Sequence, residues 1–259
     1  MKVVILCGGL GSRLREETEF RPKPMLQVGR YPILWHIMKS YAHYGFNDFI
    51  LCLGYRGNMI REYFLNYEAM NNDCTICLGK KSSIEYHGTH GEQDFRVTLV
   101  DTGPETMTGG RIGRVARYLD EDEFMLTYGD GVSDVDIRKI LAFHRSHGKK
   151  ATLTAVHPIS RFGVLDVTAE SQINHFSEKP MADGWINAGF MVLDRSVLKL
   201  LTGDACVLEH EPLQQLAEGG ELMAYCHKGF FFAMDTYRDY NAINELWASG
   251  KAPWKVWTP

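Results

Sequence analysis

Short apolar runs alternate with longer amphipathic stretches along the first 157 residues of the chain. A short continuous apolar run is typical of a buried strand, whereas apolar residues that recur every three or four positions are typical of a helix. The predicted strands are 2–6, 48–55, 96–102, 123–131 and 150–156, and the predicted helices are 32–45, 57–67, 109–119 and 136–148. Elements in this alternating order form a mainly parallel sheet with helices on both faces.

The pattern changes after about residue 158, where strand and turn residues predominate. Strand-like segments at 162–180 and 185–194 precede helical patterns at 211–220 and 237–250. No linker rich in proline or serine and no repeat separates residues 1–157 from residues 158–259. We therefore expect a single α/β domain over 1–259, with a Rossmann-like mixed, mainly parallel sheet flanked by helices and a β-rich C-terminal elaboration.

The composition limits the kinds of partner that the chain can bind. Its 259 residues carry a formal net charge of -4 and are 45% hydrophobic, so it lacks the basic field typical of nucleic-acid-binding proteins. The apolar run before Cys7 is too short for a signal peptide, and no run approaches the roughly 20 residues of a membrane span. We expect a cytoplasmic protein that binds neither nucleic acid nor membrane, and whose six cysteines are reduced core thiols.

A glycine-rich loop follows the first predicted strand. Gly8, Gly9 and Gly11 lie at the carboxyl end of that strand, the edge at which open parallel sheets bind ligands. The loop lacks the third glycine of a dinucleotide-binding fingerprint, and 20–47 contains no acidic residue that could bind a ribose. Arg13 occupies the position of the second glycine of a P-loop. The sequence therefore disfavours both of these sites.

Two cations follow the loop. Arg13 can hold phosphate oxygens with its planar guanidinium, and Lys23 supplies a compact charge between Pro22 and Pro24, whose rings fix the backbone. These residues predict a polyphosphate site. A strand-to-helix turn with solvated cations is the alternative for the loop alone.

A second glycine pair, Gly109 and Gly110, lies between Thr108 and Arg111 and opens a predicted helix. Because backbone N–H groups are exposed at a helix N-terminus, this stretch predicts contacts with a base or a phosphate.

Two aspartates lie where apolar strands end. Asp130 lies near the end of the predicted strand at 123–131, and Asp235 follows the apolar segment 230–234. Mg²⁺ is usually held by one or two carboxylates together with substrate phosphates, so this pair beside a phosphate loop predicts a site for one divalent cation. A turn or a helix cap is the alternative for either aspartate alone.

Groups suited to a sugar phosphate occur toward the C-terminus. Glu178, Lys179 and Asn187, with Gly189 two residues further on, offer a carboxylate, an ammonium and an amide to hydroxyls and an anion. Taken alone, the segment 177–180 is better explained as a charged turn.

Together these motifs resemble the sugar-nucleotide pyrophosphorylases. Their signature of G-G-x-G-[ST]-R-L followed by P-K-P-[ML] matches 8–14 and 22–25. The segments DTG…MTGGR, TYGDGV and GKAPWKVW are similar to those of the glucose-1-phosphate cytidylyltransferases, and the similarity covers essentially the whole chain. Cys7 replaces the usual alanine of this family, and Ser12 its commoner threonine.

The resemblance implies a reaction in which CTP and α-D-glucose 1-phosphate give CDP-glucose and pyrophosphate, with Mg²⁺ as cofactor and with assembly of identical subunits. It implies catalytic roles for Arg13, Lys23 and Asp130, and metal binding by Asp130 and Asp235. It implies sugar-phosphate binding by Glu178, Lys179, Asn187 and Gly189 within residues 158–259. The nucleotide-binding residues that it implies within residues 1–157 are Leu6, Cys7, Gly8, Gly9, Gly11, Ser12, Arg13, Lys23, Thr108, Gly109, Gly110, Arg111, Tyr128 and Gly129.

Several alternatives stay open from the sequence. One is the same reaction with dTTP or UTP, or with another hexose 1-phosphate. A catalytically silent, nucleotide-sensing homologue is disfavoured because the cations and the aspartates are all present, and a dinucleotide-dependent oxidoreductase is disfavoured by the missing glycine and acid. The C-terminal segment with Trp254 and Trp257 is either an interface or a tail packed on its own core.

Overall fold

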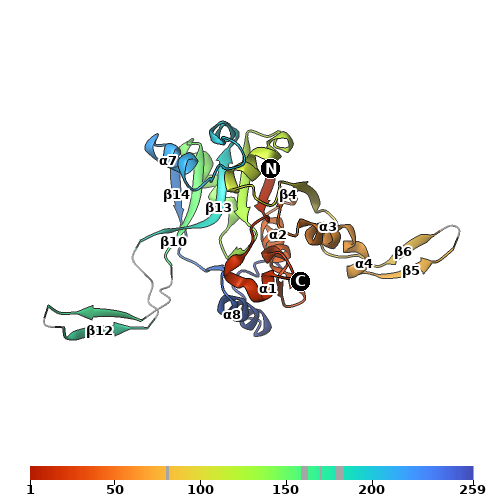
Figure 1. Ribbon diagram of the computed structural model, residues 1–259, viewed down its shortest axis with the longest axis horizontal. Coiled ribbons are helices and arrows are strands. Elements are labelled where there is room, and N and C mark those ends of the chain that lie inside the picture. The colour runs from red at the N-terminus through yellow and green to blue at the C-terminus, as the bar shows by residue number, and fades with distance from the viewer. Residues whose placement is uncertain (80–81, 159–162, 170, 179–183, 259) are drawn as a thin grey trace.

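A seven-stranded sheet forms the centre of the molecule in the computed structural model, which describes residues 1–79, 82–158, 163–169, 171–178 and 184–258 (Figure 1). The strand order is β14-β10-β13-β8-β1-β4-β7, with β13 antiparallel to both of its neighbours and the other neighbouring pairs parallel. The mixed, mainly parallel sheet predicted from the sequence is thus confirmed. Its strands are β1 (Lys2–Leu6), β4 (Asp48–Leu53), β7 (Arg96–Asp101), β8 (Glu123–Tyr128), β10 (Ala151–Val156), β13 (Ile186–Asp194) and β14 (Leu222–Cys226).

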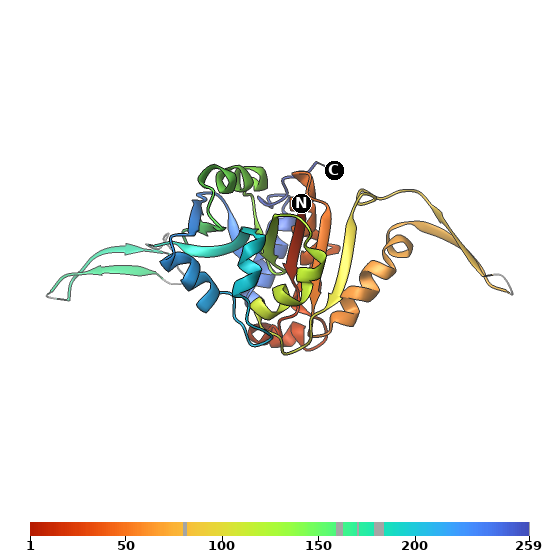
Figure 2. The same cartoon turned by 90° about the horizontal axis from the view of Figure 1, so that it is seen from above.

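Helices cover both faces of this sheet (Figure 2). Alternate side chains of β1 point to opposite faces, so Val3 and Ile5 belong to one apolar core, and Val4 and Leu6 to a second. The first core contains residues of α2 (Ile33–His43), α3 (Gly57–Leu65), α6 (Ile137–His147) and α8 (Tyr237–Ala248). The second contains residues of α5 (Thr108–Val115) and α7 (Glu211–Glu218). All six predicted helices are confirmed.

Short elements complete the chain between these helices and strands. The small antiparallel pair β9–β15 is the most important of them for function, because it brings Asp130 next to the segment that ends in Asp235: the Met234 amide donates to the Asp130 carbonyl at 3.0 Å. The short elements are η1 (Ser12–Leu14), α1 (Arg15–Thr18), η2 (Lys23–Met25), β2 (Gln27–Val28), β3 (Tyr31–Pro32), α4 (Tyr67–Asn71), η3 (Ala116–Tyr118), β9 (Gly131–Ser133), η4 (Arg195–Leu200) and β15 (Phe231–Ala233).

Two hairpins project from opposite ends of the molecule (Figures 1 and 2). One consists of β5 (Asp73–Cys77) and β6 (Ser83–His87), and the other of β11 (Val164–Val167) and β12 (Ile173–Ser177); each is a two-stranded sheet of its own. The sequence did not predict the first hairpin, because its apolar residues alternate with polar ones over only a few positions. Of the strand-like segments predicted after residue 158, 185–194 forms β13 of the main sheet, whereas β11 and β12 from the earlier segment lie outside it.

All six cysteines are free thiols, but they are not all in the core. Cys7 and Cys52 are buried, whereas Cys77 and Cys226 are exposed. The prediction of core thiols was therefore wrong for the latter two, because Cys77 ends a strand of a projecting hairpin and Cys226 ends the edge strand β14.

The C-terminal tail packs on the core of its own chain. Trp254 is fully buried and Trp257 nearly so, and the Trp254 indole faces the His36 ring with centroids 6.2 Å apart. His36 is itself fully buried in α2, where one ring nitrogen lies 2.9 Å from the Val28 carbonyl. Burial lowers the pKa of His36 to about 4, so the imidazole is neutral at physiological pH.

No helix in the described ranges combines the length and the apolar character needed to cross a membrane.

Titration of His36 predicts a pH-dependent stability. Its pKa is about 4 in the folded chain against an ordinary value of 6.5, so only the unfolded chain gains a proton between these values and stability falls as the pH decreases through that range. The loss due to this group reaches about 2 kcal/mol by about pH 5. Urea unfolding at about pH 7.5 and about pH 5 measures it. In His36→Gln, which keeps a donor for Val28, the decline should be shallower; equal declines would contradict the assignment.

Candidate active site

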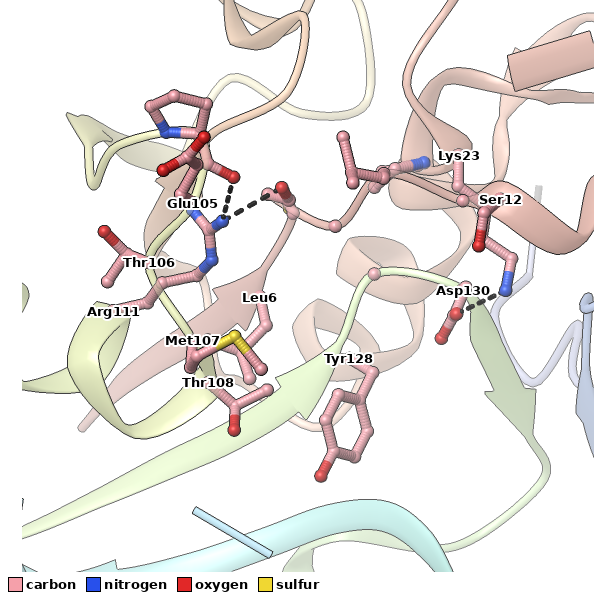
Figure 3. Close-up of a pocket in the computed structure, with 18 residues that line it drawn as sticks. Leu6, Ser12, Lys23, Glu105, Thr106, Met107, Thr108, Arg111, Tyr128 and Asp130 are labelled. Atoms are coloured by element: carbon pink, nitrogen blue, oxygen red, sulfur yellow. Dashed lines mark hydrogen bonds and ion pairs between the residues drawn. The ribbon is translucent and has the colours of Figure 1, made fainter. Parts of the chain in front are cut away.

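A cavity of about 410 Å³ lies at the carboxyl ends of β1 and β8 (Figure 3). The chain runs outward from β1 through β4 to β7 and returns to β8 on the other side of β1. Adjacent connections leave the sheet in opposite directions at such a point, which opens a crevice for ligands. The residues that line it are Leu6, Cys7, Gly8, Gly9, Leu10, Gly11, Ser12, Lys23, Pro24, Pro104, Glu105, Thr106, Met107, Thr108, Arg111, Tyr128, Gly129 and Asp130.

Most residues proposed for nucleotide binding line this cavity. Those outside the lining are Arg13, Gly109 and Gly110. Leu10, Pro24 and the segment 104–107 also line the cavity but were not predicted to do so. Residues 104–106 lie directly between the motifs DTG and MTGGR, and Met107 begins the second of them. Only the position of 104–107 next to these motifs could have indicated a role in the site, because proline, glutamate, threonine and methionine have no common chemistry.

The Arg111 side chain connects several backbone segments at the edge of the cavity through hydrogen bonds. Its guanidinium is buried, with 5% of the residue exposed, and donates to five oxygen atoms at 2.8–3.2 Å: the carbonyls of Gly8, Leu53, Gly103 and Pro104 and the Thr102 hydroxyl. Burial lowers the pKa of Arg111, but an arginine still keeps its charge at neutral pH. These donors are therefore engaged with the protein itself, and the geometry favours a positioning role for this side chain.

The first glycine of the loop is required by this arginine. A Cβ atom on Gly8 would lie 2.0 Å from Arg111 Nη1, whereas a Cβ atom on Gly9 would meet no heavy atom within 4 Å. The lack of a side chain at Gly8 therefore allows Arg111 to pack against the loop. The lack of a side chain at Gly9 leaves space in the cavity.

Gly109 and Gly110 also serve packing. A Cβ atom on Gly109 would lie 2.6 Å from Cys206 Sγ, and one on Gly110 would lie 2.7 Å from the backbone of Asp204. The Gly110 amide donates to the Cys206 carbonyl at 3.1 Å, and Arg114 forms an ion pair with Asp204 at 2.6 Å. The first turn of α5 thus lies directly on the segment 204–206. Met107, just before α5, lines the cavity and also donates its amide to the Asp204 carbonyl at 2.8 Å.

Lys23 joins the two predicted metal-binding aspartates. Its Nζ donates to Asp130 Oδ2 and to Asp235 Oδ1, each at 2.7 Å, and its side chain is only 12% exposed. Burial alone would lower the pKa of Lys23, but the charges and hydrogen bonds of the two carboxylates outweigh burial and raise it. Arg13 lies at the edge of this group, with Nη1 3.9 Å from Asp235 Oδ2 and a side chain that is 77% exposed.

The local sequence explains why these three charges converge. Pro22 sets the backbone before the short helix η2 that starts at Lys23. Asp130 follows β8, and Asp235 lies between β15 and the first turn of α8, where Thr236 and Asp239 form a capping box. Both carboxylates are therefore held at the ends of regular elements rather than on long loops.

Cys7 lines the cavity as a buried free thiol. Burial raises the pKa of its thiol well above the ordinary value, so the reactive thiolate form is suppressed.

The residues predicted to bind the sugar phosphate occupy three different positions. Asn187 and Gly189 lie on β13, where the Gly189 amide donates to Asn187 Oδ1 at 2.8 Å and a Cβ atom on Gly189 would lie 2.3 Å from the Tyr128 ring. Glu178 follows the hairpin strand β12 and is exposed. Lys179 lies outside the described residues.

The residues present fit one hard divalent cation that substrate phosphates help to coordinate. Two carboxylates already converge on one cationic group, the Lys23 ammonium. The described ranges contain no cluster of three or more histidine, cysteine, aspartate or glutamate side chains that could hold a metal by themselves. Mg²⁺ commonly binds to one or two carboxylates, with substrate phosphates and water as its other ligands.

Comparison with known proteins agrees with this geometry. A family model described as nucleotidyl transferase matches residues 2–226. The sheet and the cavity at its topological switch point have the architecture of this class. The molecule is thus built as a nucleotidyl transferase.

Comparison with individual relatives shows to which family of nucleotidyl transferases the chain belongs. Glucose-1-phosphate cytidylyltransferase of Salmonella typhimurium is 54% identical over 259 residues, which cover 99% of this chain and 100% of that protein. Mannose-1-phosphate guanyltransferase of Saccharomyces cerevisiae is 27% identical, with 97% of this chain and 66% of that protein covered. The chain belongs to the glucose-1-phosphate cytidylyltransferase family.

A solved structure shows the same fold at lower identity. HddC from Yersinia pseudotuberculosis complexed with GMP-PN superposes with a TM-score of 0.71 and 22% identity, and covers 95% of this chain and 99% of that chain. Helices and strands are therefore arranged alike in the two proteins, although most side chains differ.

Two alanine substitutions in the glycine loop should distinguish the position that packs on Arg111 from the position that leaves space for a ligand. In Gly8→Ala the new methyl group collides with Arg111, and overpacking of this kind costs about 1–3 kcal/mol, so the thermal midpoint should fall by several degrees. In Gly9→Ala the midpoint should stay unchanged and CTP binding should weaken, because the methyl group enters the cavity. Thermal unfolding and calorimetric titration with CTP measure both. Equal midpoints for the two variants would contradict the role of Arg111.

Proposed function

We propose that this protein transfers the cytidylyl group of CTP to α-D-glucose 1-phosphate and so forms CDP-glucose and pyrophosphate. The observation that carries the proposal is the 54% identity over the full length to a glucose-1-phosphate cytidylyltransferase, in a chain whose cavity brings together the glycine loop, Lys23 and Asp130. Identity to a guanyltransferase is half as high, which supports CTP as the nucleotide.

The reaction needs no protein nucleophile. A phosphate oxygen of the sugar phosphate is already ionised and attacks the α-phosphorus of CTP in line, while the bond to the departing pyrophosphate breaks. The chain therefore has to hold the two substrates in register and to neutralise the charge that develops. We assign neutralisation to Arg13 and Lys23: the exposed Arg13 side chain has room to move onto the triphosphate, whereas Lys23 is held in place.

We assign Mg²⁺ to Asp130 and Asp235. When bound, the ion supplies positive charge next to the phosphates of the nucleotide. The chain itself contributes the two carboxylates, and Lys23 balances their charge. The remaining nucleotide contacts are assigned to Gly9 and Ser12, and the sugar-phosphate contacts to Asn187 and Glu178, as well as to Lys179 outside the described residues.

The choice of substrates is tested by pyrophosphate release with five nucleoside triphosphates and several hexose 1-phosphates. We expect the highest kcat/KM with CTP and glucose 1-phosphate. A higher value with dTTP or UTP, or with another hexose 1-phosphate, would reassign the substrate within the same reaction. No pyrophosphate release with any pair would favour a silent, nucleotide-sensing homologue.

Two substitutions test the charged centre. Lys23→Ala and Asp130→Asn should each lower kcat by about two orders of magnitude, as the loss of one electrostatic stabiliser typically does. Lys251→Ala, at an exposed position near the C-terminus, is the control and should retain full turnover. Steady-state kinetics with saturating CTP measure all three. Turnover within about threefold of the parent for either active-site variant would refute the role assigned to that residue.

We also propose that identical subunits assemble through the projecting hairpins. In β5–β6 the pairs Cys74–Tyr86 and Ile76–Ile84 share one face, and Ile76 and Ile84 are 55% and 53% exposed. A two-stranded sheet is only marginally stable alone, so an apolar face of this kind favours burial against another subunit. In β11–β12 the pairs Leu165–Phe176 and Val167–Ile173 form a second such face.

Light scattering coupled to size-exclusion chromatography tests this assembly. Ile84→Lys places a charge on the apolar face of β5–β6 and should lower the molar mass of the particle. Ser83→Lys adds the same charge on the opposite face, next to Cys77, and should leave the mass unchanged. A monomeric parent protein, or equal masses for the two variants, would reject the assembly through this hairpin.

A further inference from the structure

Glu209 joins two residues of the cavity wall without lining the cavity itself. Thr108 Oγ1 donates to Glu209 Oε2 at 2.6 Å, and the Tyr128 hydroxyl donates to Glu209 Oε1. Thr108 lies in the first turn of α5 and Tyr128 at the end of β8. Figure 3 shows the hydroxyl groups of both side chains turned in the same direction. One carboxylate behind the wall therefore fixes two side chains from different elements.

The position of Glu209 is itself well determined. The preceding residue, Leu208, is fully buried, and its amide donates to Thr108 Oγ1 at 2.9 Å. Thr108 thus accepts from the backbone at 208 and donates to the carboxylate at 209. This pair of bonds fixes the segment that carries Glu209 to the start of α5.

Glu209 also decides the direction of the Tyr128 proton. An ionised carboxylate can only accept hydrogen bonds, so the hydroxyl proton of Tyr128 points toward Glu209 and the lone pairs of the oxygen point elsewhere. Burial, together with the charge of Glu209, raises the pKa of Tyr128, which keeps the phenol protonated. The acceptor site of the Tyr128 oxygen is consequently directed away from Glu209.

Tyr128 lies where the cavity meets β13. Its ring packs on Gly189, and its hydroxyl oxygen accepts a hydrogen bond from the side-chain amide of Asn187, whose own oxygen accepts from the Gly189 amide. Both of these residues lie on the side that we assign to the sugar phosphate. Glu209, Tyr128 and Asn187 therefore form a chain of hydrogen bonds that leads from behind the cavity wall to the sugar-phosphate side.

We infer that Glu209 is a positioning residue for the sugar phosphate: through the Tyr128 hydroxyl it fixes the Asn187 side chain that we assign to the sugar phosphate. This inference rests on the proposed function. Thr108 gives the same carboxylate a fixed location relative to the nucleotide cavity, so the hexose is aligned with the nucleotide through one side chain.

The test compares Glu209→Ala, Glu209→Gln and Glu211→Gln in the full-length protein. Displacement of a substrate by about 1 Å can cost up to about 100-fold in rate. Glu209→Ala should accordingly raise KM for glucose 1-phosphate and lower kcat/KM for it by about 10- to 100-fold, while the CTP dissociation constant stays within about threefold. Glutamine has one acceptor oxygen where glutamate has two, so Glu209→Gln should fall between Glu209→Ala and the parent. The exposed Glu211 lies two residues away, and Glu211→Gln should differ from the parent by no more than about twofold.

Repeating the Glu209→Gln substitution in the Tyr128→Phe variant shows whether Glu209 acts through the Tyr128 hydroxyl. If Glu209 acts through the Tyr128 hydroxyl, Glu209→Gln should add little to the loss that Tyr128→Phe already causes; fully additive losses would overturn the inference. Equal weakening of CTP and sugar-phosphate binding, or a lower thermal midpoint with unchanged KM, would assign Glu209 a merely structural role. Parent turnover with CTP and glucose 1-phosphate is measured first, so failure of the proposed function is seen separately from failure of this inference.

Discussion

A single buried guanidinium fastens the carboxyl ends of three neighbouring strands. Parallel strands end in carbonyl groups that no further strand residue satisfies, and a cavity at this edge exposes them. Arg111 donates to carbonyls that follow β1 and β7 and to the last carbonyl of β4. The glycine loop can therefore be open toward a ligand on one side because its other side is held by charge-assisted hydrogen bonds. The rest of the site is arranged around this fixed edge.

The remaining charges of the site are balanced among themselves. Lys23 lies between two aspartates that come from distant regions of the chain, and the pair β9–β15 brings those regions together. A lone buried ammonium or a lone pair of carboxylates would be costly to desolvate. Their mutual contact lowers this cost beside the cavity in which phosphates are expected. The groups that we propose for catalysis and for metal binding thus also connect distant parts of the fold through their ion pairs.

The sequence was sufficient for the sheet, the helices and most of the cavity, because apolar periodicity and the glycine motifs are local signals. It was not sufficient for Arg111, whose guanidinium binds the chain itself, or for Gly109 and Gly110, whose neighbours lie at 204–206. Glu209 was missed for the same reason: a carboxylate shortly before a helix has no distinctive pattern. These roles depend on contacts between distant segments, which a single sequence does not display.

The contact between the start of α5 and the segment 204–206 has a consequence for protein engineering and for divergence within the family. Gly110 has room for no side chain against the backbone of Asp204, and Arg114 pairs with the side chain of the same residue. A chimaera that takes its nucleotide-binding half from one relative and its C-terminal half from another would join surfaces that were not selected together. The two segments have to be exchanged as a unit, even though almost a hundred residues separate them in the chain.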